Sequence, residues 1–207
     1  MGLALLKYQY EEPVKSSRYF RPRPEMKYTY ADYAAWELPP RKRYELYHGR
    51  AFAMAAPSIA HQTILLNLGV ELSTFLKNKT CRAFVAPVDV RLFPREDRLD
   101  TTVVQPDVMV VCDPKKLSAK TCDGAPDFIA EILSHSTRRS DLLNKLNLYE
   151  EAGVREYWII DPELKTIQQY ILSEAGYIAH TFGEGEVPVH IFDGELKLSF
   201  DNIFVRT

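Results

Sequence analysis

Residues 125–134 read APDFIAEILS and place one carboxylate, Glu131, inside an apolar run. Short apolar runs of this kind are typical of strands that are buried on both faces. Burying an unpaired charge costs several kcal/mol even after the protein relaxes. Glu131 therefore needs a salt bridge, a proton or a metal ion, unless the strand lies at a sheet edge and Glu131 faces water.

Two further carboxylates occur in strand-like segments. Asp107 follows Pro106 at the head of the apolar run 108–111, and Glu45 follows Tyr44 in the short segment 44–47. Asp and Pro are common at loop-to-strand boundaries, and alternation along a strand allows a solvent-facing Glu. Taken alone, neither position indicates a functional site.

Lys145 lies in the segment that follows this strand. Helical spacing of apolar residues predicts a helix from Ser140 to Gly153, with Lys145 at the margin of the buried stripe and Asp141 one turn before it. Lys145 could extend its ammonium into water, where a pair with Asp141 is worth a few tenths of a kcal/mol. Because the helix directly follows the strand of Glu131, it can instead return Lys145 to that strand.

Two carboxylates and a lysine suit one kind of chemistry. Mg²⁺ binds one or two protein carboxylates and keeps positions for water and phosphate oxygens. The metal activates water and offsets charge on a phosphodiester, while a nearby lysine stabilises the transition state. The combination predicts metal-assisted phosphodiester hydrolysis.

The rest of the chain predicts one α/β or α+β domain with a single central sheet. Residues 1–27 have no periodicity and are expected to form an irregular N-terminal arm, whereas residues 28–207 form the domain. The expected helices are a short one after Thr29, a long one after Ser58 and the one from Ser140. The expected strands cover two segments within 44–54 around His48-Gly49, then 83–93, 103–111, 128–133, 156–160, 167–172, 177–182, 187–192 and 196–200.

The composition is that of an ordinary globular protein. The 207 residues are 46% hydrophobic and 26% charged, with a formal net charge of −2. These values exclude wholesale disorder and a charge-driven nucleic-acid coat protein, but not an enzyme that meets DNA through a local basic surface. No signal peptide or membrane span is evident, so a cytoplasmic protein without a membrane partner is expected.

Three cysteines are present, and their spacing fits no common zinc site. Cys112 and Cys122 could pair or bind metal. Reduced and mostly buried thiols are the favoured expectation.

The ordered motifs resemble those of the PD-(D/E)XK nuclease superfamily and, more narrowly, the Uma-type restriction endonuclease family. The similarity covers roughly residues 28–180. It rests on segments 44–49, 57–58, 105–107, 125–134 and 153–162, together with His61, Asp141, Lys145 and Tyr149.

The resemblance implies a restriction-endonuclease-like core, a mixed central sheet flanked by helices with extra C-terminal strands, and divalent-metal nuclease chemistry. Asp107 and Glu131 would be ligands of Mg²⁺ or Mn²⁺, and Glu45 an auxiliary acid that binds a metal directly or through water. The superfamily pattern places a lysine two residues after the Glu, but Leu133 stands there. Lys145 would supply the catalytic lysine from the following helix.

Other residues are expected to support this site. His61 lies on the apolar stripe of the long helix and is either a packed core residue or a support, as Asp141 and Tyr149 would also be. The polar, basic segment 134–139 could contact phosphates or be a solvated loop. Asp89 is a further strand carboxylate with a weaker case.

The leading hypothesis is a Mg²⁺- or Mn²⁺-dependent DNA endonuclease, expected as a homodimer because two sites related by a twofold axis cut both strands most simply. The rival is a catalytically inactive DNA- or metal-binding module. A third reading is a metal-free glycosidase that uses Glu131 and Glu45, in which Lys145 has no evident role.

Overall fold

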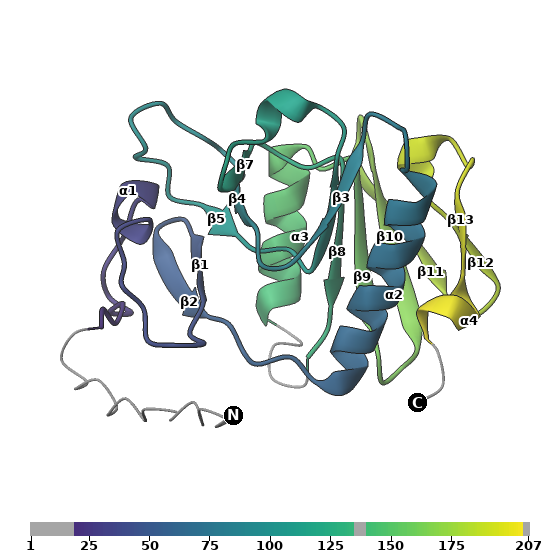
Figure 1. The fold of residues 1–207 in the computed structure, drawn as a ribbon, viewed down its shortest axis with the longest axis horizontal. Helices are drawn as coiled ribbons and strands as arrows, with labels where there is room; N and C mark the ends of the chain where they lie inside the picture. Colours follow the sequence, from purple (N-terminus) through teal and green to yellow (C-terminus); the bar gives the residue numbers. More distant parts are fainter. Residues whose placement is uncertain (1–18, 135–139, 205–207) are drawn as a thin grey trace, which may run out of the picture.

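The computed structural model describes residues 19–134 and 140–204. Its centre is a six-stranded sheet in the order β11-β10-β9-β8-β6-β3 (Figure 1). The pair β8–β9 is parallel and the other pairs are antiparallel, which confirms the expected mixed sheet. The strands are β3 (Arg82–Val85), β6 (Val108–Val111), β8 (Phe128–Ile132), β9 (Glu156–Asp161), β10 (Thr166–Ser173) and β11 (Gly176–Phe182).

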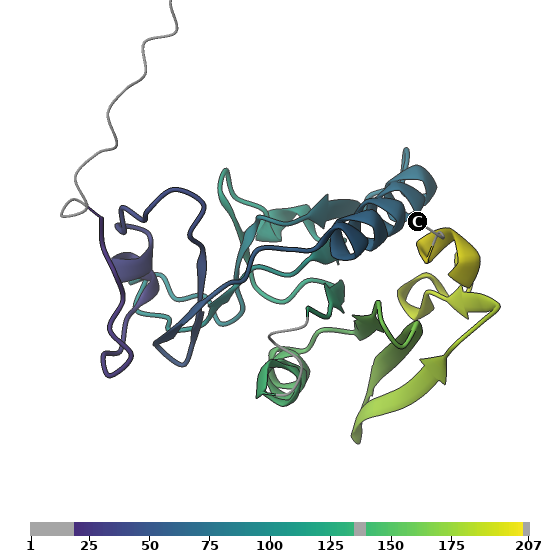
Figure 2. The same ribbon diagram turned by 90° about the horizontal axis from the view of Figure 1, so that it is seen from below.

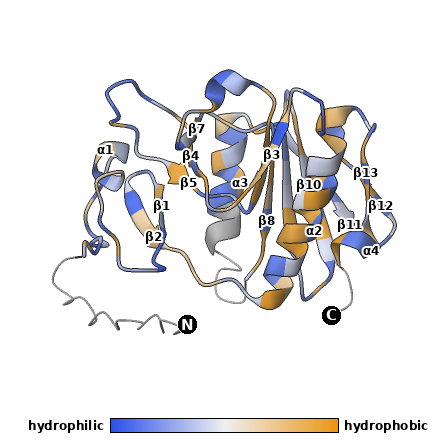
Figure 3. Ribbon diagram, viewed as in Figure 1, coloured by the Kyte–Doolittle hydropathy of each residue, from blue (hydrophilic) through white to orange (hydrophobic). Residues whose placement is uncertain are grey.

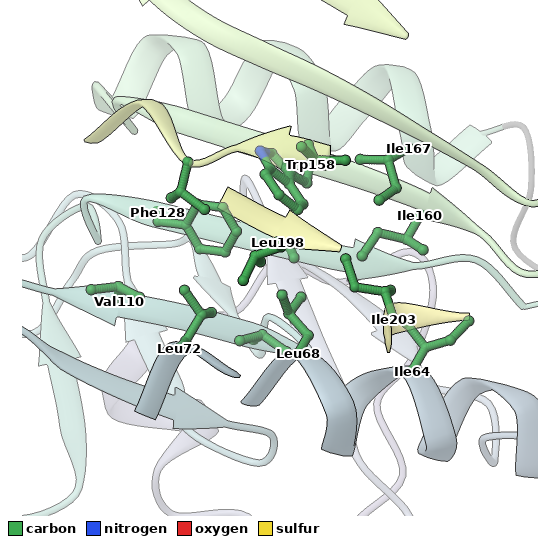
Figure 4. Close-up of a cluster of buried hydrophobic side chains, with 14 of the residues drawn as sticks. Ile64, Leu68, Leu72, Val110, Phe128, Trp158, Ile160, Ile167, Leu198 and Ile203 are labelled. Carbon is green, nitrogen blue, oxygen red and sulfur yellow. The ribbon is translucent and has the colours of Figure 1, made fainter. Parts of the chain in front are cut away.

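Two helices cover opposite faces of this sheet, α2 (Ile59–Phe75) and α3 (Ser140–Ala152) (Figure 2). Successive side chains of β8 point to opposite faces of the sheet. Phe128 packs in the core under α2, whereas Ile129 packs in the core that contains α3 residues. Figure 4 shows the first core, where Leu68 and Leu72 of α2 point toward Leu198 and toward residues of the central strands such as Phe128. The hydrophobic colouring of Figure 3 follows the central strands and α2.

A second sheet lies beside the first and has the order β2-β1-β5-β4-β7. The expectation of a single sheet was therefore wrong. Segments 83–93 and 103–111 each divide between the two sheets, with Pro87 and Pro106 at the breaks, because proline cannot donate a ladder hydrogen bond. The strands are β1 (Tyr44–Tyr47), β2 (Arg50–Ala53), β4 (Asp89–Arg91), β5 (Val103–Val104) and β7 (Thr121–Asp123).

The capping and turn residues predicted from the sequence lie at the ends of helices and strands. Thr29 caps α1 (Tyr30–Tyr33), the expected short helix, with a capping box to Asp32. His48 and Gly49 have φ of 49° and 84° and join β1 to β2. Ser58 caps α2.

The C-terminal tail adds a two-stranded ribbon of β12 (Glu186–Pro188) and β13 (Lys197–Ser199). The predicted strands there were too long, since residues 190–192 form the 3-10 helix η2 (His190–Phe192) and α4 (Phe200–Ile203) begins at Phe200. A second 3-10 helix, η1 (Pro114–Lys116), precedes β7. The tail contributes to the core beneath α2.

Of the expected N-terminal arm, residues 1–18 lie outside the described residues. Residues 19–27 are irregular and lie against the domain, where the Phe20 ring stacks on Trp36 at a centroid distance of 5.0 Å. Within the described part of the chain, no helix has the length and hydropathy needed to cross a membrane.

The expectation of three reduced thiols was wrong for two of them. Cys81 and Cys112 form a disulfide. The antiparallel register pairs Arg82 with Val111, so the cysteines lie directly opposite one another at the ends of β3 and β6. Cys122 is a free, buried thiol, and burial raises its pKa to about 11.

A buried carboxylate ties the tail to the central sheet. Glu156 of β9 accepts hydrogen bonds from Trp158 Nε1 (2.7 Å), Gln169 Nε2 (2.7 Å) and the backbone N–H of Ile191 (2.9 Å). Burial raises the pKa of Glu156 above its ordinary value of 4.5. This carboxylate has a structural role away from Glu131.

We expect Glu156→Gln to lower the free energy of unfolding by about 1–3 kcal/mol, because the new amide N–H₂ faces a donor. The folded-state pKa of Glu156 lies above the unfolded one, so its contribution to wild-type stability falls as pH rises from about 4.5 through the folded pKa. The Glu156→Gln variant lacks this pH dependence. The difference in the free energy of unfolding between the wild type and the variant therefore narrows as pH rises. Urea unfolding at several pH values tests this, with exposed Glu174→Gln as the control; a pH-independent difference contradicts it.

Candidate active site

Four residues predicted from the sequence line one cavity of about 350 Å³. Glu45 lies on β1, Asp107 immediately before β6, Glu131 on β8 and Lys145 on α3. The second sheet thus contributes one carboxylate and the central sheet region the other two. The cavity wall also includes apolar residues such as Phe52.

Lys145 joins two of the carboxylates. Its Nζ donates to Glu131 Oε1 at 2.8 Å and to Glu45 Oε1 at 3.2 Å. The exposed fractions of Glu45, Glu131 and Lys145 are 5%, 9% and 8%. Glu131 therefore does not face water from an edge strand, and Lys145 does not extend into solvent.

The topology explains why Lys145 reaches Glu131. β8, α3 and β9 form a β-α-β unit in which the two strands are parallel, so α3 must run back across the sheet. Glu131 projects to the face that α3 covers, where Tyr149 Oη also donates to Glu131 Oε1 at 2.7 Å. One oxygen of Glu131 thus accepts from both α3 residues.

Burial and charge set the protonation states. Burial raises the pKa of Glu131 to about 7, and the Lys145 ammonium opposes that rise. Burial lowers the pKa of Lys145, but Glu131 and Glu45 together raise it well above its ordinary value, so Lys145 remains an ammonium. Burial also raises the pKa of Tyr149, which keeps its hydroxyl as a donor.

Glu45 has both oxygens occupied. Oε2 accepts from the Tyr47 hydroxyl, and Oε1 accepts from the backbone N–H of Gln105 (2.8 Å) and from Lys145. This arrangement suits an anchor for Lys145. The role of Glu45 as an auxiliary metal-binding acid stays a prediction.

Asp107 is held through one oxygen. Oδ2 accepts from the backbone N–H of Ile132 at 2.8 Å and lies 3.1 Å from His61 Nε2. Among the described residues, no donor contacts Asp107 Oδ1 or Glu131 Oε2. Each carboxylate therefore keeps one oxygen that a ligand can approach.

These two carboxylates suit a hard cation. No cluster of three or more Cys, His, Asp or Glu side chains within residues 19–134 and 140–204 forms a metal site. Mg²⁺ does not need one, because it often binds one or two carboxylates and completes its shell with water and phosphate oxygens.

Three supporting residues were also predicted. His61 and Tyr149 contact Asp107 and Glu131 as described above, and both are buried. The side chain of Asp141 and the segment 135–139 lie outside the described residues. Asp89 touches none of the metal-binding candidates directly but bonds Gln105.

The sequence interpretation missed Tyr47, Gln105 and Arg43 as residues of the site. Tyr47 lies two residues from Glu45 on one strand and so shares its face, which is a usable signal. Arg43 Nη1 donates to Gln105 Oε1 at 3.4 Å. The two residues are far apart in the sequence and are brought together by the pairing of β1 with β5 in the second sheet.

Comparisons with known proteins agree with this architecture. Residues 30–201 match the model of the Uma2 family, described as "Putative restriction endonuclease". The crystal structure of a "putative nuclease belonging to DUF820" from Anabaena variabilis ATCC 29413 superposes with a TM-score of 0.69 at 22% identity, covering 86% of this chain and 97% of that one. A search of curated proteins finds no match. The predicted fold and family are confirmed.

Proposed function

This chain belongs to the Uma2 family of putative restriction endonucleases, and on that premise we propose that it is a divalent-metal-dependent endonuclease that hydrolyses DNA phosphodiester bonds. One observation carries the proposal. Asp107 and Glu131 each keep one carboxylate oxygen without a donor among the described residues, in a cavity that also contains the Lys145 ammonium.

Mg²⁺ or Mn²⁺ would be held by Asp107 and Glu131. When bound, such a cation lowers the pKa of a water ligand and offsets charge on the phosphodiester. His61 and the Ile132 N–H orient Asp107, as partners outside the ligand shell commonly do. Lys145 supplies a fixed positive charge beside the reacting phosphate, and Glu45 keeps it there.

Nicking of supercoiled plasmid tests this proposal. The purified protein is expected to nick the plasmid with Mg²⁺ or Mn²⁺ and not with EDTA. A homodimer, which we propose as the active form, would also give linear product by cutting both strands. DNA binding without cleavage under every metal would instead favour the rival, a binding module that has lost turnover.

Metal binding has a readout that does not need activity. Mn²⁺ at 100 times its Kd is expected to raise the free energy of unfolding of the wild type by about 2.7 kcal/mol. Asp107→Asn should lose most of this increase, because it removes one anionic ligand. Thermal unfolding with and without Mn²⁺ measures the effect, and exposed Asp201→Asn on α4 is the control. An undiminished Mn²⁺ response in Asp107→Asn would place the metal elsewhere.

A further inference from the structure

Arg43 is a cation of the cavity that the metal and lysine arrangement does not use. It directly precedes β1 and is half-buried, and it lines the cavity with the three carboxylates. Its carbonyl accepts from the backbone N–H of Met54 at 2.9 Å, at the base of the β1–β2 hairpin (Figure 1). The hairpin therefore fixes where the Arg43 side chain starts.

Arg43 differs from the other cations that line this cavity. Lys145 lies between Glu131 and Glu45, and His61 contacts Asp107. In the part of the chain that the structure describes, Arg43 has no carboxylate within 4.0 Å, and its only side-chain hydrogen bond is the 3.4 Å contact with a neutral amide oxygen. A guanidinium has five N–H donors, so most of its capacity is left for a ligand.

Gln105 fixes that contact. Its Nε2 donates to Asp89 Oδ1 at 2.8 Å and to Tyr33 Oη at 3.1 Å, and the residue is 7% exposed. A reversed amide would place its oxygen against the Asp89 carboxylate, so Oε1 must face Arg43. The backbone N–H of Gln105 holds Glu45, and one residue thus positions both Arg43 and the anchor of Lys145.

We propose that Arg43 binds a phosphate group of the polynucleotide substrate and that Gln105 positions it for this contact. The inference rests on the proposed nuclease function. A cavity with three carboxylates repels a polyanion, and the Lys145 ammonium is already paired with two of them. Besides a bound divalent cation, the Arg43 guanidinium is therefore the positive charge among the described lining residues that can attract a phosphodiester. The planar guanidinium matches two phosphate oxygens and is the side chain suited to bidentate contact.

Arg43→Gln tests the contact through salt dependence. Affinity for a fluorescent duplex oligonucleotide is measured by anisotropy in EDTA over a range of salt concentrations. The slope of log K against log salt is negative, and one lost phosphate contact reduces its magnitude by about 0.9 for duplex DNA. We expect that change, about tenfold weaker binding and a higher KM for nicking, with an unchanged melting temperature.

The matched control is Lys77→Gln. Lys77 is exposed beyond the C-terminal end of α2, whereas His61 lies in the first turn of that helix. The slope of log K against log salt for Lys77→Gln should equal that of the wild type. An Arg43→Gln protein with wild-type slope, affinity and KM overturns the proposal, and so does a loss of binding that only follows a lower melting temperature.

The positioning role of Gln105 has its own readout. If Gln105 acts through Arg43, Gln105→Leu weakens binding in the wild type but adds little in the Arg43→Gln background. Additive losses would contradict the positioning role. Parallel titrations with RNA of the same sequence separate the two sources of phosphodiester.

The binding assay also separates this inference from the proposed function. Salt-dependent binding that Arg43→Gln weakens, without cleavage under any metal, would support the contact and contradict the nuclease. Metal-dependent cleavage with an unaltered Arg43→Gln slope would do the reverse. A wild type that neither binds nor cleaves contradicts both.

Discussion

Glu131→Gln is expected to slow metal-dependent plasmid nicking by about 10³-fold, the upper end of what losing one preorganised electrostatic contact costs an enzyme. Glutamine keeps the size of the side chain and one oxygen that can accept from Lys145 and Tyr149. It removes the negative charge and replaces one carboxylate oxygen by an amide N–H₂. The substitution therefore tests the metal-binding role with little change in packing.

The measurement is the initial nicking rate of the wild type and the variant in Mg²⁺ and in Mn²⁺. Exposed Glu184→Gln, in the turn before β12, is the control and should cut like the wild type. Circular dichroism and melting temperature establish that Glu131→Gln is folded. A folded variant that nicks at the wild-type rate would mean that another site, or a contaminant, performs the cleavage.

The pairing of Glu131 with Lys145 could be expected from the sequence because the signals for it are local. Glu131 stands inside one apolar strand, and because the helix of Lys145 directly follows that strand, the helix could return Lys145 to Glu131. In the structure, Lys145 Nζ lies 2.8 Å from Glu131 Oε1. Tyr149, which the family resemblance included, is buried on the same helix.

What could not be predicted depends on contacts between distant segments. Pro87 and Pro106 interrupt two apolar runs, and no local signal shows that the halves of each run join different sheets. The opposition of Cys81 and Cys112 likewise follows only from the β3–β6 register.

The polar connections of the second sheet are non-local for the same reason. Gln105 was visible as part of a motif, but its bonds to Glu45, Asp89 and Arg43 span 60, 16 and 62 positions. Strand pairing between β1 and β5 brings these segments together. A sequence pattern could therefore suggest that these residues matter without showing what each one holds.

Lys145→Met is expected to have the largest effect on stability, a loss of about 3–5 kcal/mol at pH 8 in EDTA. Methionine fills a similar volume but leaves Glu131 and Glu45 buried without their shared cation. Nicking should be lost as well, because the fixed positive charge that Lys145 places beside the reacting phosphate is removed. The Mn²⁺-induced stabilisation should persist, since neither proposed ligand is removed.

The pH dependence gives this prediction its sign. The folded-state pKa of Glu131 is about 7 against an ordinary value of 4.5, so the folded protein binds more protons between these values, and the contribution of Glu131 to stability falls as pH rises through them. The Lys145 ammonium lowers the pKa of Glu131. Removing Lys145 therefore raises that pKa further, and the decrease in stability continues to higher pH. Lys145→Met should thus lose less stability at pH 5.5, where Glu131 is protonated, than at pH 8.

Urea unfolding at pH 5.5 and pH 8 measures the two losses. The double variant Lys145→Met/Glu131→Gln is the control, because it removes the charge that Lys145 offsets and should recover much of the stability at pH 8. Equal losses at both pH values, or no recovery in the double variant, would show that Lys145 stabilises the fold through its ion pair with Glu45 or through packing of its stem. The ion pair with Glu131 would then contribute little, and the Glu131 charge would have to be offset in another way.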